Sequence, residues 1–270
     1  MRGNAAFTQA LFDGEFRITK EVESFYFSVL SLCYVYCLWR FFLGPHAPAN
    51  PKNMGCKRVK VCEIFTSIQG ESTYVGLPCT FVRLAGCNLR CVYCDTQYSF
   101  ESGIEMPLDD IVSHIKLVGV NLVEITGGEP LLQGSDTLAL IRTLLDEGFE
   151  VLVETNGTLC VKDIDRRAVI ILDVKTPGSL MSDKADLSNF DHLKPADEIK
   201  FVICDKNDYD WAKDMFARFG LREKAKLLFS PALGMLPPRQ LAKWIVEDRL
   251  EVRLNVQIHK YIFGPDERGV

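Results

Sequence analysis

The 270-residue sequence lacks an excess of positive charge, and histidine is scarce in it. Its 31 Lys and Arg against 36 Asp and Glu give a net charge of −5, and only four residues are histidine. This balance argues against a general nucleic-acid binder, which normally carries a strong positive field. The composition, 47% hydrophobic and 25% charged, is ordinary for a folded protein and excludes a disordered or collagenous chain. The length allows one large domain or two small ones, with a substantial core in either case.

Long apolar runs are also absent, apart from one stretch at residues 25–43. This stretch is interrupted by two serines and Arg40, so its length is borderline for the roughly 20 residues that span a membrane. It fits a signal peptide poorly, because glutamates precede it and no small-residue cleavage pattern follows it. From Met54 onward the chain changes in character. We therefore expect residues 1–53 to be an extension that is dispensable or not translated, and residues 54–270 to form the functional domain without a membrane anchor.

After Met54, short β-branched runs alternate with amphipathic stretches. Strands are expected at residues 59–65, 81–84, 122–125, 150–154, 170–174, 198–203, 225–230 and 252–256, and helices at 107–117, 137–147, 208–219 and 238–248. Strands buried on both faces with helices between them predict an α/β fold with a parallel sheet. The sheet would be open or a partial barrel, since periodicity does not distinguish the two. In both, a site would lie at the carboxyl ends of the strands.

Ten cysteines are many for a chain of this length, and three of them are crowded together. Cys87, Cys91 and Cys94 form a C-x3-C-x2-C loop directly after an expected strand. Soft thiolates in such a loop select zinc, Cu(I) or an iron–sulfur cluster. None of the four histidines lies within a few residues of the loop, so a fourth ligand for zinc is not obvious. Three thiolates therefore favour a cubane cluster with one open iron, and zinc or unligated thiols are the alternatives.

The other seven cysteines are scattered, mostly within apolar runs. Free cysteine is often buried as a small hydrophobic residue. We therefore expect a reducing compartment, the cytoplasm, and buried thiols at Cys33, Cys37, Cys56, Cys62, Cys79, Cys160 and Cys204.

The cysteine loop resembles the signature of radical S-adenosylmethionine enzymes, in which the residue directly before the last cysteine is aromatic, as Tyr93 is here. The resemblance implies a partial (open) parallel β/α barrel and a [4Fe–4S] cluster whose open iron is chelated by S-adenosylmethionine. One electron from the cluster would cleave the sulfonium and give a 5′-deoxyadenosyl radical, which abstracts a substrate hydrogen. The resemblance assigns to the cofactor the residues Tyr93, Cys94, Asp95, Gly128, Asp173 and Lys175.

Three of these residues lie in two segments that end expected strands. Residues 126–130 read TGGEP; taken alone they indicate an ordinary tight turn, but beside the cysteine loop they resemble the motif that contacts the methionyl amino group. Asp173-Val174-Lys175 resembles polar positions that hold the rest of the cofactor. A solvated strand end is the alternative for both charged residues. Because many relatives have Ser-Pro-Lys here, Lys175 keeps the match better than Asp173.

Three other segments narrow the choice: IQGES at residues 68–72, the CDT triplet at residues 94–96, and residues 256–261. Together they resemble the 7-carboxy-7-deazaguanine synthase family, from about residue 62 to the C-terminus. That resemblance implies ring contraction of 6-carboxy-5,6,7,8-tetrahydropterin to 7-carboxy-7-deazaguanine with loss of ammonia, in the biosynthesis of queuosine and other 7-deazapurines. It also implies Mg²⁺ bound by Thr96, and substrate contacts from Ile68, Gln69, Gly70, Arg83, Thr126 and Val270.

The planar guanidinium of Arg83 suits a substrate carboxylate. The alternatives are a surface ion pair for Arg83 and a simple turn at residues 69–70. Ser72 departs from the family, since many relatives have glycine there. No role follows from the sequence for His259 or Lys260.

The resemblance also implies a homodimer and an electron donor such as flavodoxin or ferredoxin, with a small pterin substrate and neither nucleic acid nor a membrane as partner. Three rival functions remain. The nearest is a radical S-adenosylmethionine activating enzyme that makes a glycyl radical on a partner protein. A zinc-stabilised binding module and a membrane-tethered electron carrier are the other two.

Overall fold

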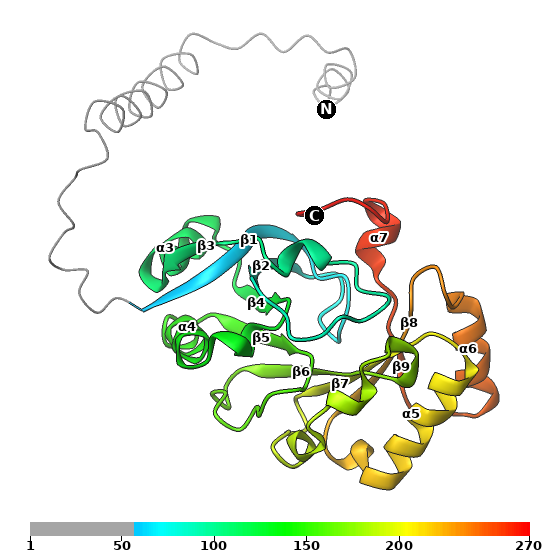
Figure 1. Ribbon diagram of the computed structural model, residues 1–270. Helices are drawn as coiled ribbons and strands as arrows, with labels where there is room; N and C mark the ends of the chain where they lie inside the picture. Colours follow the sequence, from blue (N-terminus) through cyan, green and yellow to red (C-terminus); the bar gives the residue numbers. More distant parts are fainter. Residues whose placement is uncertain (1–56) are drawn as a thin grey trace, which may run out of the picture. The chain divides into compact units, whose positions relative to one another are not determined.

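Figure 1 shows the computed structural model, which describes residues 57–270 as an open, curved sheet with helices outside it. The sheet order is β3-β1-β2-β4-β5-β6-β7-β8-β9; β1 is antiparallel to both neighbours, and every pair from β2 to β9 is parallel. The strands are β1 (Arg58–Ile68), β2 (Pro78–Leu84), β3 (Ile104–Pro107), β4 (Leu122–Gly127), β5 (Glu150–Thr155), β6 (Val169–Val174), β7 (Glu198–Ile203), β8 (Lys226–Pro231) and β9 (Arg253–Leu254). The expected partial parallel β/α barrel is confirmed. The expectation for residues 1–53 falls outside the described residues.

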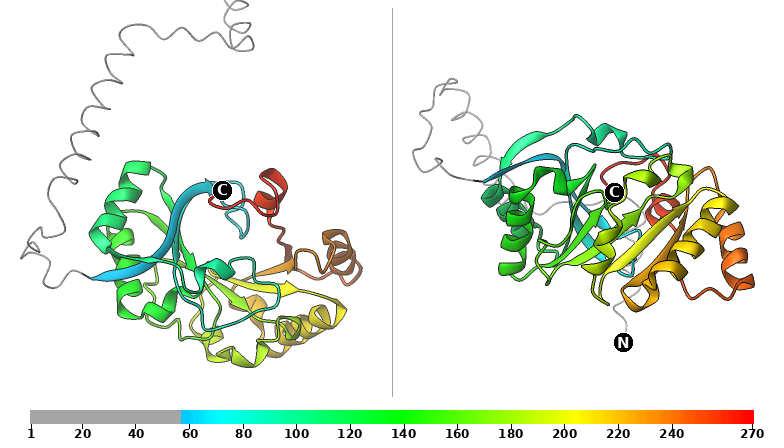
Figure 2. Two further views of the ribbon diagram at one scale, coloured as in Figure 1. Left: turned by 45° about the horizontal axis from the view of Figure 1, so that its top comes forward. Right: turned by 60° about the horizontal axis from the view of Figure 1, so that its bottom comes forward.

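The longer helices cover the outer face of the sheet (Figure 2). They are α3 (Leu108–Val118), α4 (Ser135–Asp146), α5 (Lys206–Phe219) and α6 (Pro238–Glu247). Each buries an apolar stripe against the strands; in α4 the stripe is Leu140, Ile141 and Leu144. Helix α5 begins where the Asp205 side chain accepts a hydrogen bond from the Asp208 amide, and it ends at left-handed Gly220.

The inner face of the sheet changes from apolar to polar toward the carboxyl ends of the strands. A small cluster at its base includes Leu122, Leu152 and Ile171. Two residues further along the same strands lie Glu124, Glu154 and Asp173, which point to the same side because strand side chains alternate. The register of these strands therefore places carboxylates on the inner face, directly above the apolar base.

The segment between β1 and β2 closes the open side of the half-barrel. Thr73 donates its backbone N–H to Glu198 of β7 at 3.0 Å, and the amide of Ser72 donates to Asn255 Oδ1 at 2.8 Å. Ser72 has a φ of +64°, the left-handed region in which glycine is favoured. Its hydroxyl accepts a hydrogen bond from the Tyr74 amide at 3.0 Å, which supports this left-handed turn.

The expected strands and helices are confirmed, with differences at the ends. The strand expected at 252–256 is shorter, because only Arg253–Leu254 pairs with β8 at the edge of the sheet. Strand β3 and the short helix α7 (Ile258–Ile262) were not expected. Within residues 57–270, no helix is long and apolar enough to cross a membrane.

Candidate active site

A cavity of about 460 Å³ opens at the carboxyl ends of the parallel strands. Its wall includes side chains from the strands, the cysteine loop, the IQGES segment and the C-terminal segment. Every residue to which the sequence analysis assigned a site role lines this one cavity: Ile68, Gln69, Gly70, Arg83, Cys87, Cys91, Tyr93, Cys94, Asp95, Thr96, Thr126, Gly128, Asp173, Lys175 and Val270. Their roles stay predictions, but the structure brings all of them together.

The cysteine loop runs from the end of β2 to a 3-10 turn, η2 (Gln97–Ser99). The three thiols are free and partly buried on the cavity wall. The Leu89 amide donates to Cys87 Sγ at 3.4 Å, and Thr96 Oγ1 lies 3.7 Å from Cys94 Sγ. Within residues 57–270, no three His, Cys, Asp or Glu side chains are grouped as a single metal ion requires. A cubane cluster has a different requirement, because each thiolate binds a separate iron.

The glycines of the TGGEP segment let β4 pack directly on the cysteine loop. A Cβ at Gly128 would lie 2.0 Å from the Gly86 carbonyl oxygen and 2.8 Å from Cys87 Cβ. Buried Glu129 accepts hydrogen bonds from Thr155 Oγ1 at 2.8 Å and from the Asn156 amide at 2.6 Å. The segment therefore joins the cysteine loop to the end of β5, whatever ligand it contacts.

Asp173 and Lys175 form a buried pair at the end of β6. Lys175 Nζ lies 2.8 Å from Asp173 Oδ2 and 5.6 Å from the centre of the Tyr93 ring. Burial raises the pKa of Asp173, but the charges of Lys175 and Lys200 outweigh it and hold the pKa below its usual value. Only 8% of Asp173 is exposed, so the alternative of a solvated strand end is wrong. Within the described residues, its Oδ1 is buried without a hydrogen-bond partner.

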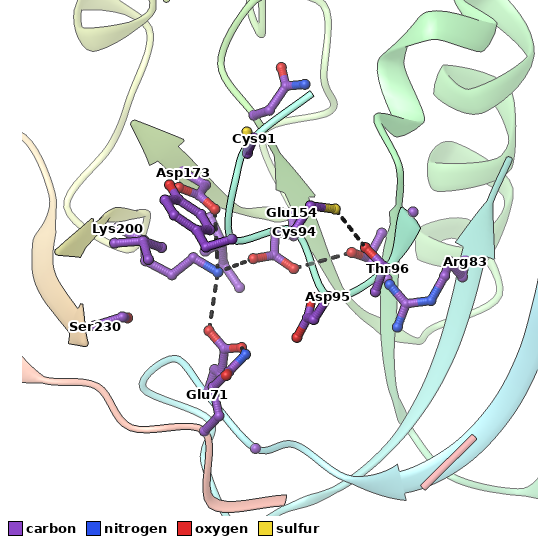
Figure 3. Close-up of a pocket in the computed structure, with 18 of the residues that line it drawn as sticks. Glu71, Arg83, Cys91, Cys94, Asp95, Thr96, Glu154, Asp173, Lys200 and Ser230 are labelled. Atoms are coloured by element: carbon purple, nitrogen blue, oxygen red, sulfur yellow. Dashed lines mark hydrogen bonds and ion pairs between the residues drawn. The ribbon is translucent and has the colours of Figure 1, made fainter. Parts of the chain in front are cut away.

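Lys200, from β7, is the central cation of the cavity floor (Figure 3). Its Nζ lies 3.1 Å from Glu71 and 3.6 Å from Asp173, and it also pairs closely with Glu154. These carboxylates raise the pKa of Lys200 well above its usual value, although burial opposes them. Lys200 therefore stays charged. It connects the IQGES segment to strands β5 and β6, which carry Glu154 and Asp173.

Glu124, on β4, is a buried carboxyl group with a different environment. Gln69 Nε2 donates to Glu124 Oε2, while Gln69 Oε1 accepts the Glu71 amide at 3.0 Å. Burial, together with the charges of Glu154 and Glu71, raises the pKa of Glu124 well above its usual value. Both ends of the Gln69 amide are thus fixed by partners within the cavity wall.

Arg83, on β2, forms an ion pair that is not on the open surface. Its Nε lies 2.7 Å from Glu63 Oε1, and its side chain is 14% exposed. The guanidinium also lies 5.9 Å from the centre of the Phe65 ring. The pair belongs to the wall of the half-barrel, so the alternative of a surface ion pair is wrong.

The C-terminal segment crosses the IQGES segment and reaches the cysteine loop. The Ile258 amide donates to the Gly70 carbonyl at 2.9 Å, and a Cβ at Gly70 would lie 1.9 Å from His259 Nδ1. Lys260 pairs with Asp95, next to the third cysteine. His259 and Lys260 therefore hold helix α7 over the cavity, a role that the sequence did not reveal.

Comparisons with known proteins identify this arrangement. Residues 82–175 match the family model of the Radical SAM superfamily. Over 226 residues the chain is 42% identical to the 7-carboxy-7-deazaguanine synthase of Koribacter versatilis, covering 78% of this chain and 100% of that protein. It is 45% identical over 215 residues to the Chlorobaculum tepidum protein of that name, covering 78% of this chain and 97% of that one. The chain belongs to the 7-carboxy-7-deazaguanine synthase family.

A solved structure agrees with this at the level of the fold. The crystal structure of QueE from Escherichia coli aligns with a TM-score of 0.64 and 22% sequence identity. The alignment covers 78% of this chain and 99% of the other chain. The half-barrel is therefore shared with a solved structure.

Membership in this radical S-adenosylmethionine family implies a [4Fe–4S] cluster and S-adenosylmethionine. The residues present fit both groups. Three free thiols share one cavity wall, and Asp173 Oδ1 is a buried acceptor that lacks a donor among the described residues. A cationic amino group or a hydroxyl of a ligand would satisfy it, because a buried acceptor without a partner is costly.

Sequence reasoning missed the charged floor of this synthase-family cavity. Glu124 and Lys200 interrupt apolar strands at inward-facing positions, and both line the cavity. The signal was present, because a charged residue in a strand that is otherwise buried on both faces must have a partner or a ligand. This signal could be interpreted only once the inward-facing side of each strand was known.

Proposed function

We propose that the protein converts 6-carboxy-5,6,7,8-tetrahydropterin to 7-carboxy-7-deazaguanine with release of ammonia. The observation that carries this proposal is the single cavity of about 460 Å³, which is lined both by the cysteine loop and by Arg83 and Gln69. A cofactor and a carboxylated pterin can therefore share one cavity. The names of the similar proteins support the same reaction.

At the cofactor end, Cys87, Cys91 and Cys94 would hold the cluster. When bound, the cluster and S-adenosylmethionine supply the radical that removes a substrate hydrogen. Asp173 and Lys175 would orient the polar groups of the cofactor, since their charges lie 2.8 Å apart on the cavity wall. The remaining assigned contacts are Tyr93, Cys94, Asp95 and Gly128, all on the same wall.

At the substrate end, Arg83 would bind the substrate carboxylate. Gln69, Gly70 and Ile68 would contact the pterin from the segment that closes the half-barrel, and Thr126 from β4. The amide of Gln69 is oriented by Glu124 and by the Glu71 amide, so its remaining hydrogen-bond donor has a fixed direction. Val270 lines the same cavity and would contact the substrate from the C-terminal tail.

Several further properties belong to the proposal. We propose that Thr96 binds Mg²⁺ together with substrate oxygens and water, which is the kind of site that Mg²⁺ uses. A flavodoxin or ferredoxin would reduce the cluster, and the protein would act as a cytoplasmic homodimer. Residues 1–53 would be dispensable, so a chain that begins at Met54 should keep full activity.

The test is anaerobic reconstitution with iron and sulfide, followed by addition of S-adenosylmethionine, Mg²⁺, reductant and the pterin. Mass spectrometry should detect 7-carboxy-7-deazaguanine, and Cys91→Ala should abolish it. Cys160→Ala is the matched control. The expectation of a buried thiol is wrong at Cys160, which is exposed, and Cys160 is not part of the cavity wall. Formation of 5′-deoxyadenosine without the deazapurine would support the radical chemistry but contradict the substrate assignment. A reconstituted cluster that yields neither product would favour an activating enzyme.

A further inference from the structure

Arg83 is paired with the carboxylate of Glu63, which is not part of the cavity wall. Glu63, on β1, is the direct cross-strand neighbour of Arg83 on β2, and its Oε1 accepts a hydrogen bond from Arg83 Nε at 2.7 Å. Within residues 57–270, neither Nη group of Arg83 has a hydrogen-bond partner. Arg83 lines the cavity and Glu63 does not. The Nε donor of Arg83 is therefore occupied by Glu63, and the Nη edge of the guanidinium remains available for a ligand in the cavity.

Glu63 is itself held in place by Tyr98, which in turn contacts Arg268 near the C-terminus. Tyr98 donates its hydroxyl hydrogen to the same Glu63 Oε1 at 2.8 Å. The guanidinium of Arg268 lies 4.2 Å from the centre of the Tyr98 ring, a cation–π contact. Arg268 is two residues before Val270, which lines the cavity. A continuous series of contacts thus runs from the C-terminal tail through Tyr98 and Glu63 to Arg83.

We propose that Glu63 is a positioning residue that fixes the plane of the Arg83 guanidinium, so that its Nη edge receives the substrate carboxylate, and that Tyr98 and Arg268 hold Glu63 in place. This inference rests on the proposed function, which assigns the carboxylate to Arg83. A bidentate pair requires both a fixed plane and a fixed direction of the guanidinium. Fixing them before the ligand arrives reduces the conformational entropy lost on binding.

The charge and the hydrogen bond of Glu63 act in opposite directions on this site. Its negative charge partly neutralises Arg83 and weakens the attraction for a second carboxylate, whereas its hydrogen bond orients the guanidinium. Glu63→Gln keeps an oxygen that accepts from Arg83 Nε and Tyr98, but removes the charge. Glu63→Ala removes both. The two variants therefore separate orientation from charge.

The experiment measures equilibrium binding of two ligands to the reconstituted full-length protein without reductant, so that no turnover occurs. One ligand is 6-carboxy-5,6,7,8-tetrahydropterin, and the other is its uncharged carboxamide. For Glu63→Ala we expect the Kd of the carboxylate to rise about tenfold and that of the carboxamide less than threefold. Tyr98→Phe should raise the carboxylate Kd about threefold, and Glu63→Gln should stay within threefold of the original protein.

The control is Glu105→Ala on the edge strand β3, where the side chain is exposed and outside the cavity wall. An equal rise in both dissociation constants for Glu63→Ala would overturn the proposal, since it would indicate a general structural role. An unchanged carboxylate Kd would overturn it as well. Tyr98→Phe tests the same series if Glu63→Ala does not fold. Failure of the proposed function is seen separately, as an absence of deazapurine from the original protein under reducing conditions.

Discussion

Gly128→Ala should disrupt the cluster while leaving the fold in place. The new Cβ would lie 2.0 Å from the Gly86 carbonyl oxygen and 2.6 Å from its carbonyl carbon, whereas real Cβ contacts are essentially never under 3.0 Å. The cysteine loop must therefore move away from β4 by about 1 Å, because the obstacle is backbone and no side chain can rotate out of the way. Such overpacking typically costs about 1–3 kcal/mol of stability. The thiols are displaced by the same movement, since Cys87 directly follows Gly86.

The assay is the iron content and visible absorption of the anaerobically reconstituted protein, with urea unfolding measured in parallel. We expect Gly128→Ala to bind less than half the iron of the original protein and to lose about 1–3 kcal/mol. The control is Gly148→Ala in the turn before β5, where φ is +89° and no atom lies within 4 Å of the added Cβ. It should lose about 1 kcal/mol through backbone strain and keep its cluster. A Gly128→Ala protein with a full cluster would refute the reasoning.

Three further predictions concern the cavity wall. Lys200→Met leaves three carboxylates without their shared cation, and urea unfolding should show a loss of about 3–5 kcal/mol. The raised pKa of Glu124 means that the folded protein keeps a proton that the unfolded chain releases above pH 4.5, so this group makes stability fall as pH rises from there. Glu124→Gln should remove this fall in the free energy of unfolding, which is at most about 1.4 kcal/mol for each pH unit. Parallel curves of unfolding free energy against pH for the two proteins, between about pH 5 and pH 8, would contradict this. Lys260→Ala breaks the pair with Asp95 that holds α7, and steady-state kinetics should show a KM about threefold higher; an unchanged KM would contradict the closing role.

Most of the half-barrel could be predicted from the sequence, because parallel strands buried on both faces read as short β-branched runs. The segment expected at residues 198–203 has the same bounds as β7. Edge elements could not be predicted in this way. Strand β3 has exposed residues and is fixed mainly by its pairing with β1, and α7 is a five-residue helix held by contacts to Gly70 and Asp95. Such elements depend on tertiary contacts that no local pattern records.

The candidate site divides in a similar way. The cysteine loop and the TGGEP segment carry their chemistry in consecutive residues, so their proximity followed from the ends of their strands. Glu63, Glu124 and Lys200 act through partners far away in the sequence. Lys200, for example, meets Glu71 and Glu154 only because β7 and β5 face the same interior. The spatial arrangement of the strands in the half-barrel had to be known before these pairs could be recognised.

The most direct test of the shared cavity is an anaerobic crystal structure of the reconstituted protein with S-adenosylmethionine and 6-carboxy-5,6,7,8-tetrahydropterin bound together. We expect the cofactor beside Cys87, Cys91 and Cys94, with a polar group against Asp173 Oδ1. The pterin carboxylate should contact the Nη edge of Arg83, with Glu63 still on Nε. A pterin whose carboxylate lies away from Arg83, or a cofactor that leaves Asp173 Oδ1 without a partner, would contradict this arrangement of the site.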